Sequence, residues 1–384
     1  MATRGSHDTS PGPRKSEFST HGRRLILSIL LLAPATACLD LNITNENEPD
    51  LERALANAGD VGSLISATFN IWYQGVYGTD DNSPGLFLSN QSFQHTAPWS
   101  NAGMETYGRI PRVKLENDPL HGDYRYLARA WTYSYRAASA LANGLRALED
   151  PAVAEQLSPE ELALYRTFGR FVQGLSHATV ALFYEKGFVL DETTDLNEPL
   201  QPLDYTTLME EAFRFFDEAI EMAESSSFTV PFDWIPAELN AEEFVRVVRS
   251  YRARLRAQVA RTPDEREAVD WDAVIADVDA GVQSTFMLVA DWDHGWWNAF
   301  LDYATWFMWG QLPYFSYGMA DQSGNVAEWL ALPMDEKKHQ FGDGRPVLIV
   351  TPDLRFPQGV TVEEQRANEG SYIRIAAEFE KSGQ

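Results

Sequence analysis

The stretch SPEELALYRTFGRFVQGLSHATVALFY, residues 158–184, decides the fold of this chain. Ser158, Pro159 and Glu161 form a capping box with proline at the first helical position, a strong signal for a helix start. The helix that this signal opens is predicted to run to about Tyr184. A long helix therefore lies near the middle of the sequence, and the flanking residues can be interpreted from it outward.

Apolar residues at helical spacing continue on both sides of this stretch. A second capping box, Asn240–Glu243, opens a helix that reaches about Arg261. Connections of modest length between the helices favour antiparallel neighbours. Close approach of the helices is favoured by small residues at Ala137, Ala138, Ala140, Gly169, Gly174 and Ala178. The other predicted helices cover residues 60–72, 122–148, 204–220 and 270–283.

This pattern predicts a mainly α fold. Paired helices of this kind are similar to tetratricopeptide-like stacking, although no 34-residue consensus repeats along the chain. Residues 78–120 and 284–360 are rich in glycine, proline, asparagine and aromatic residues, and we expect long irregular insertions there. Segments of this length are usually functional or disordered, and their aromatic content argues against disorder.

Composition excludes several classes of function. The 384 residues include 31 lysines and arginines against 56 aspartates and glutamates, which gives a formal net charge of -25. A nucleic-acid partner is not expected, because phosphate binding needs clustered basic residues. The single cysteine excludes an intrachain disulfide, a cysteine-based zinc cluster and an iron–sulfur site.

The first 37 residues are interpreted as an export signal. A basic segment precedes the short apolar run Leu25–Ala33, which is far below the ~20 residues of a membrane-spanning helix. Ala37 lies directly before Cys38, an arrangement that resembles the lipobox of bacterial lipoproteins and implies lipidation of Cys38. The alternative is an ordinary signal peptide cut after Ala37. Residues 38–50 would then form a polar tether, and residues 51–384 the helical domain.

Several stretches together resemble the SusD/RagB family of outer-membrane nutrient-uptake lipoproteins. Their order along the chain carries the resemblance, which covers about residues 38–260. The stretches are Cys38–Leu41 leading to Thr44–Asn47 with Asp60–Val61, Arg136–Gly144, Gly174–Tyr184 with Gly187–Asp191, Tyr205–Ile220 and Arg246–Leu255.

The resemblance implies a fold, a location and a partner. It implies a tetratricopeptide-like scaffold with large irregular insertions, anchored by lipid at the cell outer membrane and exposed at the surface. It further implies a SusC-like TonB-dependent transporter as partner, glycans or peptides as ligands, and neither catalysis nor a cofactor. Family members have further C-terminal helices that residues up to Gln384 do not provide, so a C-terminally truncated scaffold is one interpretation.

Aromatic residues in the irregular segments are the candidate binding groups. An aromatic ring can cover the apolar face of a sugar while neighbouring amides and carboxylates bond its hydroxyls. The family's glycan binders use aromatics from comparable loops, so this part of the prediction is regional. The candidate ligand-binding residues are Trp99, Asn101, Tyr107, Trp292, Asp293, Trp296 and Trp297.

A structural role is the alternative for each tryptophan. Trp72 lies on an apolar helix stripe and is predicted to be a core residue, and apolar neighbours favour the same for Trp306 and Trp309. Trp296 and Trp297 are adjacent and cannot share one face of a helix or strand. One of the two is therefore expected to be exposed, and the sequence leaves open which.

Two other functions remain as alternatives to glycan capture. One is capture of peptides, basic ones in particular. The other is a helical glycoside hydrolase, for which Asp291 and Asp293 would be the carboxylate pair, with His294 beside them. No histidine spacing typical of zinc is present, so no metal site is predicted. Residues 191–198 are rich in oxygen ligands but lack EF-hand spacing, which favours a solvated acidic loop over a calcium site.

Overall fold

The computed structural model describes residues 54–78, 83–96, 103–289, 295–298, 313–337 and 347–368. The chain divides into two units, Met1–Leu51 and Glu52–Gln384, and every described residue belongs to the second. Helices make up 58% of the structure and strands 3%, which confirms the predicted mainly α class. Among the described helices, none is long and apolar enough to cross a membrane.

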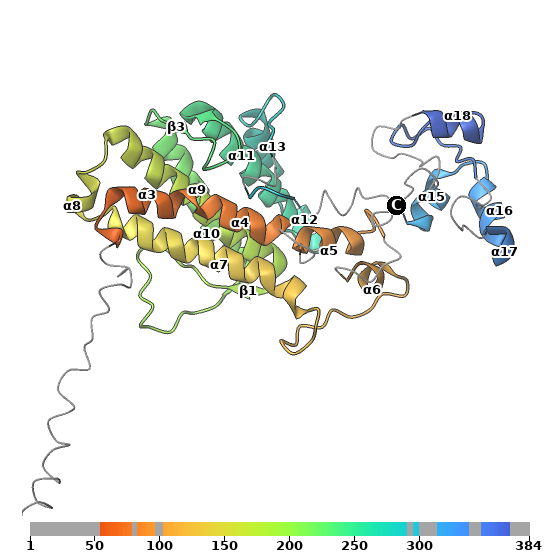
Figure 1. Ribbon diagram of the computed structural model, residues 1–384, viewed down its shortest axis with the longest axis horizontal. Coiled ribbons are helices and arrows are strands. Elements are labelled where there is room, and N and C mark those ends of the chain that lie inside the picture. The colour runs from red at the N-terminus through yellow and green to blue at the C-terminus, as the bar shows by residue number, and fades with distance from the viewer. Residues whose placement is uncertain are drawn as a thin grey trace, which may run out of the picture. The chain divides into compact units, whose positions relative to one another are not determined.

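Helices that are neighbours in sequence pack side by side (Figure 1). Packing follows the order α3–α4, α7, α9, α10, α11 and α13, and shorter helices lie between some of them. The bounds are α3 (Ala58–Ser66), α4 (Thr68–Tyr77), α5 (Pro84–Gln91), α6 (Met104–Gly108), α7 (Tyr124–Ala147), α8 (Pro151–Ala154), α9 (Pro159–Phe183), α10 (Tyr205–Glu224), α11 (Ala241–Gln258), α12 (Pro263–Glu267) and α13 (Trp271–Asp279).

Two short antiparallel ladders join the connections between these helices. Strand β1 (Lys186–Gly187) pairs with β2 (Leu203–Asp204) between α9 and α10. Strand β3 (Thr229–Val230) pairs with β4 (Leu239–Asn240) between α10 and α11. Each ladder therefore closes the loop that returns the chain for the next antiparallel helix.

Side-chain contacts show that packed neighbours are antiparallel. Arg170 of α9 pairs with Glu218 of α10, whereas His177, further along α9, contacts Phe215, earlier in α10. Similar contacts show that α7 is antiparallel to α3–α4 and to α9. They also show that α11 is antiparallel to α10 and to α13. The result is a series of helical hairpins, as the connection lengths predict.

Helix α9 occupies the centre of the core. Residues 171–181 are all buried, which requires neighbours on every side of the helix. A Cβ atom added at Gly174 would lie 2.6 Å from the ring of Phe216, and one at Gly169 would lie 2.9 Å from Leu145. The predicted role of these glycines in close helix packing is confirmed.

The capping boxes predicted from sequence are present. Ser158 and Glu161 bond reciprocally at the start of α9, and Asn240 and Glu243 do so at the start of α11. The predicted single helix over residues 60–72 is wrong, because α3 ends at Ser66 and α4 begins at Thr68. The Thr68 hydroxyl donates to the carbonyl of Ile65 at 2.6 Å, and this side-chain bond competes with the helical ladder at the break.

The segments predicted to be irregular contain short helices, which is a further correction. Residues 78–120 include α5 and α6, and residues 284–360 include α15 (Tyr314–Ala320), α16 (Asn325–Ala331) and α17 (Met334–Lys337). The reason is local at α5, where the Ser83 hydroxyl accepts a hydrogen bond from the Leu86 amide and Pro84 stands at the first helical position. Residues of α5, α6 and α7 form a second core cluster, Leu86, Phe87, Met104, Tyr107 and Tyr126.

The described residues after 313 form a small cluster of their own. Its buried residues are Val326, Ile349 and Phe356. The Gln365 side chain of α18 (Val362–Ala367) holds this cluster by bonding both backbone groups of Ile349, at 3.1 and 2.7 Å.

Candidate ligand-binding surface

Helix α4 contacts residues 295–298, which follow α13 in the sequence. The Asn70 side-chain amide donates to the carbonyl oxygen of Gly295 at 3.0 Å, and Gly295 has a φ of +72°. A second link is a hydrogen bond between the side chain of Asn298 and the hydroxyl of Tyr73. Residues 295–298 are therefore fixed on α4 at both ends.

This docking separates the two adjacent tryptophans. Trp296 is 3% exposed, and its ring centroid lies 5.8 Å from that of Phe69 and 5.4 Å from that of Tyr73. Trp297 is half-buried. The ring of Trp296 is thus part of the hydrophobic core and does not offer a face to a ligand, whereas Trp297 lies at the surface, as the adjacency argument requires for one of the pair.

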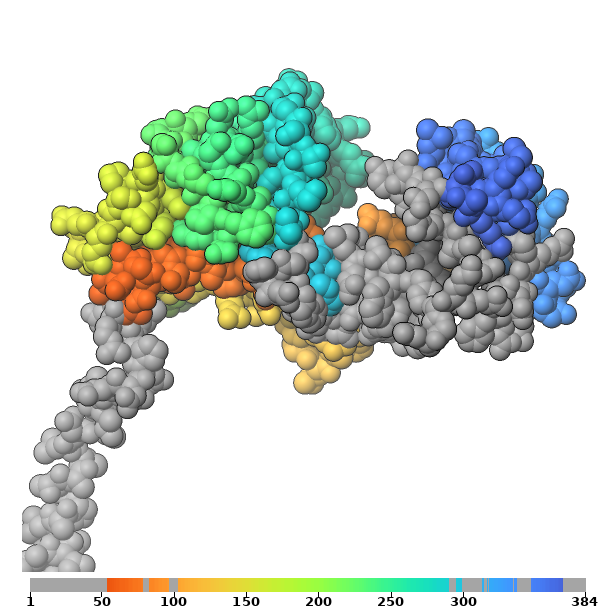
Figure 2. Space-filling view, turned by 45° about the horizontal axis from the view of Figure 1, so that its top comes forward, coloured from red at the N-terminus to blue at the C-terminus, as the bar shows by residue number. Residues whose placement is uncertain are grey.

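The exposed side of α4 next to Trp297 is lined by amides and an aromatic ring. Asn70, Gln74 and Tyr77 are half-buried and lie at i, i+4 and i+7 of one helix face, and Gln74 donates to Asn70 at 2.6 Å. The α3–α4 pair lies at the surface of the unit (Figure 2). We call Asn70, Gln74, Tyr77, Trp297 and Asn298 the Trp297 surface.

Tyrosine hydroxyls gather behind this surface. The rings of Tyr73 and Tyr77 are 4.8 Å apart, and burial raises the pKa of Tyr73 to about 12, against the hydrogen bond with Asn298, which lowers it. Burial also raises the pKa of Tyr251 on α11, as does Tyr77, whereas the charge of Arg254 lowers it. Tyr73 and Tyr251 therefore remain protonated at neutral pH and can act as neutral hydrogen-bond donors.

Other predicted binding residues are placed differently. Tyr107 is buried in the second core cluster, its ring packs against Phe87 at 4.9 Å, and its hydroxyl donates to Asp123 at 2.6 Å. Its ring therefore has a structural role here and cannot cover a sugar. The remaining predicted residues lie outside the described residues: Trp99, Asn101, Trp292, Asp293, Trp306, Trp309, the proposed carboxylate partner Asp291, and the predicted lipidation site Cys38.

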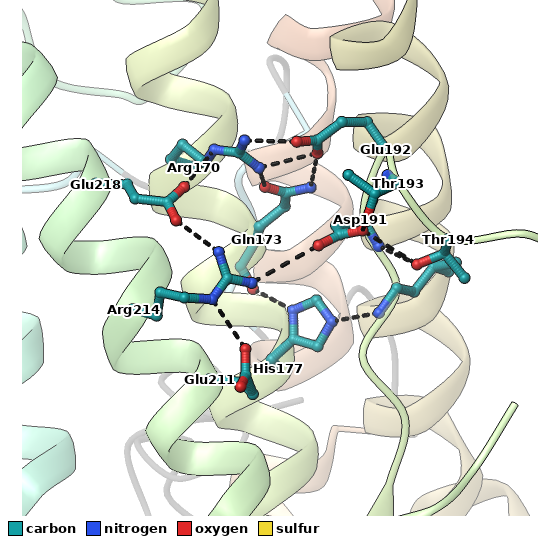
Figure 3. A network of polar contacts seen from close by, with 11 residues as sticks. Arg170, Gln173, His177, Asp191, Glu192, Thr193, Thr194, Glu211, Arg214 and Glu218 are labelled. Atoms are coloured by element: carbon teal, nitrogen blue, oxygen red, sulfur yellow. Dashed lines mark hydrogen bonds and ion pairs between the residues drawn. The ribbon is translucent and has the colours of Figure 1, made fainter.

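The loop over residues 188–198 takes part in a polar network that sequence reasoning missed (Figure 3). Arg170 lies between Glu192 at 2.5 Å and Glu218 at 2.8 Å. Arg214 continues the chain of ion pairs from Glu218 to Asp191, which lies 3.7 Å away. The only signal in the sequence is the presence of Arg170 and Arg214 in two predicted helices on either side of the loop.

These contacts correct the prediction of a solvated acidic loop for Asp191 and Glu192, whereas residues 195–198 are exposed. Asp191 is buried, and its carboxylate accepts hydrogen bonds from Thr193 and Thr194. In the part of the chain that the structure describes, no group of three or more metal-ligating side chains could hold a metal ion. Arg146 and Glu192–Asn197 line an open hollow of about 400 Å³. The guanidinium of Arg146 already bonds the carbonyls of Glu192 and Thr194.

His177 connects α9 to this loop through two hydrogen bonds that only the neutral imidazole can make. It is 1% exposed, its Nδ1 lies 2.7 Å from the carbonyl of Gln173, and its Nε2 lies 3.0 Å from the amide nitrogen of Leu190. Because a carbonyl only accepts and an amide N–H only donates, Nδ1 carries the proton and Nε2 accepts. A second proton would destroy the bond to Leu190, so the neutral ring is part of the fold.

We expect stability to fall as the pH decreases from 7.5 to 5.5. Burial and the charge of Arg214 lower the pKa of His177, against its bond to Gln173 and the charges of Asp191 and Glu211. The unfolded chain takes up a proton near pH 6.5 and the folded chain does not, which costs about 1 kcal/mol per such histidine over this range. Urea unfolding at both pH values measures the loss.

Single substitutions show which histidine causes this pH dependence of stability. Burial also lowers the pKa of His95, to about 4, so both buried histidines among the described residues contribute with the same sign. His177→Asn should remove the contribution of His177, about 1 kcal/mol over this pH range. An unchanged pH dependence in His177→Asn would show that this ring is not held neutral.

Comparison of the chain with protein-family models, with curated proteins and with solved structures gave no match, so its functional assignment rests on the residues and contacts described above.

Proposed function

We propose that this protein is a surface lipoprotein that binds oligosaccharides and delivers them to a TonB-dependent, SusC-like transporter at the outer membrane. The proposal includes anchoring through a lipid on Cys38 and a tetratricopeptide-like arrangement of the antiparallel helix pairs. Its support is the ordered set of SusD/RagB-like stretches in the sequence together with the surface beside α4. The protein would act by binding and transfer, without catalysis.

The observation that carries the proposal is the position of Trp297. Trp297 is half-buried, and residues on both sides of it are bonded to α4, Gly295 by Asn70 and Asn298 by Tyr73. The same helix carries the half-buried Gln74 and Tyr77. Aromatic rings cover the C–H faces of sugars, and amide groups both donate to and accept from hydroxyls. The surface therefore combines the two kinds of contact that an oligosaccharide needs.

The helical array suits such a role because it is rigid where the surface is built. Phe69 lies beneath Trp296 and stacks on Phe171 of α9 at 6.1 Å, so residues 295–298 rest on the central helix through two aromatic layers. A fixed ring loses little conformational entropy when a ligand binds. We expect modest affinity, because a shallow surface leaves much of an oligosaccharide in water.

Replacing Trp297 by alanine should weaken oligosaccharide binding about tenfold, the loss expected for one ring contact of about 1.4 kcal/mol. Trp297→Phe keeps an aromatic face and should retain most of the affinity. Isothermal titration calorimetry with a panel of neutral and acidic hexasaccharides measures both.

A matched control is Trp271→Ala, which removes a tryptophan that is 44% exposed on α13. This variant should bind like the parent protein. Equal weakening by Trp271→Ala and Trp297→Ala, or no binding of any oligosaccharide by the parent protein, would contradict the proposal. Binding of basic peptides in place of every sugar would favour peptide capture.

A further inference from the structure

We infer that the Trp297 surface selects an anionic sugar, whose carboxylate or sulfate group is bound by Arg254. This inference rests on the proposed function and names the ligand class of the same surface. It is not suggested by composition, because a chain with a net charge of -25 repels anions over most of its surface. Within the described residues, Arg254 is an exception to this rule.

The first step concerns Arg254 itself. Five arginines lie on α11 between Arg246 and Arg256, and within the described residues four of them form ion pairs with carboxylates. Arg254 is the exception in this part of the chain: it is exposed and pairs with no described carboxylate. Its guanidinium lies over the ring of Tyr251, 4.9 Å from the centroid. Its charge is thus held in place by an aromatic face and remains available to a ligand.

The second step places Arg254 next to the binding surface. Tyr251 packs edge-on against Trp72 of α4 at 6.1 Å, and its hydroxyl is close enough to Tyr77 and Tyr73 for both to affect its pKa. Tyr77 belongs to the Trp297 surface, and Tyr73 bonds Asn298 of the same surface. Arg254 of α11 therefore lies on a tyrosine that packs against α4.

The third step concerns the neighbouring charges. Arg129 of α7 donates to the carbonyl of Gln74 at 2.9 Å and lies over the ring of Tyr133, so α4 and α7 hold this guanidinium in place. Burial raises the pKa of Tyr251 and the charge of Arg254, which lies over its ring, lowers it. An anion bound by Arg254 would therefore lie beside Tyr251.

The chemistry of the groups fits a sugar acid. A guanidinium can bind a carboxylate or sulfate through two parallel N–H bonds, while the sugar ring lies against an aromatic side chain and its hydroxyls meet amides and phenols. Exposed ion pairs contribute little on their own and weaken with salt. Arg254 is therefore expected to provide selectivity, and the ring of Trp297 most of the affinity.

Oligogalacturonate and its methyl ester provide a test, because they share one sugar skeleton and differ in charge. The parent protein should bind the galacturonate hexamer at least fivefold more tightly than the fully methylated hexamer at low salt. The preference should shrink at high salt. A sulfated galactan hexamer, compared with the desulfated one, shows whether sulfate serves as well as carboxylate.

Substitutions then assign the selectivity. Arg254→Gln should abolish the preference for the acid and leave binding of the methyl ester within twofold, and Arg254→Lys should restore part of the preference. Arg246→Gln is the matched control, since it removes the same charge from the same helix at an arginine that pairs with Glu242. Circular dichroism confirms that each variant is folded.

The outcomes separate this inference from the proposed function. Equal binding of acid and ester that still depends on Trp297 would overturn the inference and leave oligosaccharide capture in place. A preference for the acid that survives in Arg254→Gln would overturn the assignment of Arg254. Failure of the parent protein to bind acid, ester or any other oligosaccharide would overturn the proposed function itself.

Discussion

Replacing Asp277 by alanine is expected to lower the free energy of unfolding by about 3–5 kcal/mol, the range for breaking a buried ion pair. Asp277 is 3% exposed and accepts from the buried Arg252 at 2.8 Å and from Arg256 at 3.3 Å. Arg249 approaches the same carboxylate at 3.6 Å. Without it, Arg252 would keep a single carboxylate partner, Asp217, inside the contact of α11 with α10 and α13.

Urea unfolding followed by circular dichroism measures this loss. The control is Glu224→Ala, which removes an exposed partner of Arg249 at 2.9 Å and should cost below about 1 kcal/mol. If Asp277→Ala lost no more than Glu224→Ala, the three arginines would not depend on this carboxylate. Asp277→Asn keeps the shape without the charge and should fall between the two.

Phe171→Ala should be comparably destabilising, by about 3–5 kcal/mol, because a large ring leaves a cavity at the centre of the core. Phe171 is fully buried on α9, where no neighbouring helix can move in without breaking its other contacts. Its ring lies within 5.2–6.5 Å of the ring centroids of Phe69, Phe168, Phe216, Phe244 and Tyr251.

The same substitution should also weaken ligand binding, because Phe69 supports Trp296 and Tyr251 supports Arg254. Thermal unfolding and calorimetry on one preparation measure both effects. Phe232→Ala removes a ring that is 40% exposed and should change neither by much. A variant that loses stability but binds normally would show that the surface does not depend on the aromatic layers below it.

Local signals allowed most of the helical array to be predicted from sequence. Ser158 with Glu161 and Asn240 with Glu243 mark helix starts through bonds within one turn, so no tertiary information is needed. The break between α3 and α4 could not be predicted, because Ala67 is a good helix former and a threonine such as Thr68 can also bond the preceding turn inside an unbroken helix.

The candidate binding surface was only partly predictable, because its geometry depends on contacts between distant residues. Adjacency showed that Trp296 and Trp297 must differ in exposure, but only the bond from Asn70 to Gly295 decides which ring is buried. In the same way, composition suggested water around Asp191 and Glu192, whereas Arg170 and Arg214 on two other helices bury them. Neither outcome follows from the neighbouring sequence.

The bond between Asn70 and Gly295 joins residues 225 positions apart, and this separation has a consequence for the timing of synthesis. All of α3–α13 must be synthesised before Gly295 can reach α4. Such distant contacts form late, because closing a long loop is entropically unfavourable. A nascent chain therefore has no complete Trp297 surface. If this surface binds the ligand, as proposed, a molecule whose synthesis is unfinished cannot bind it.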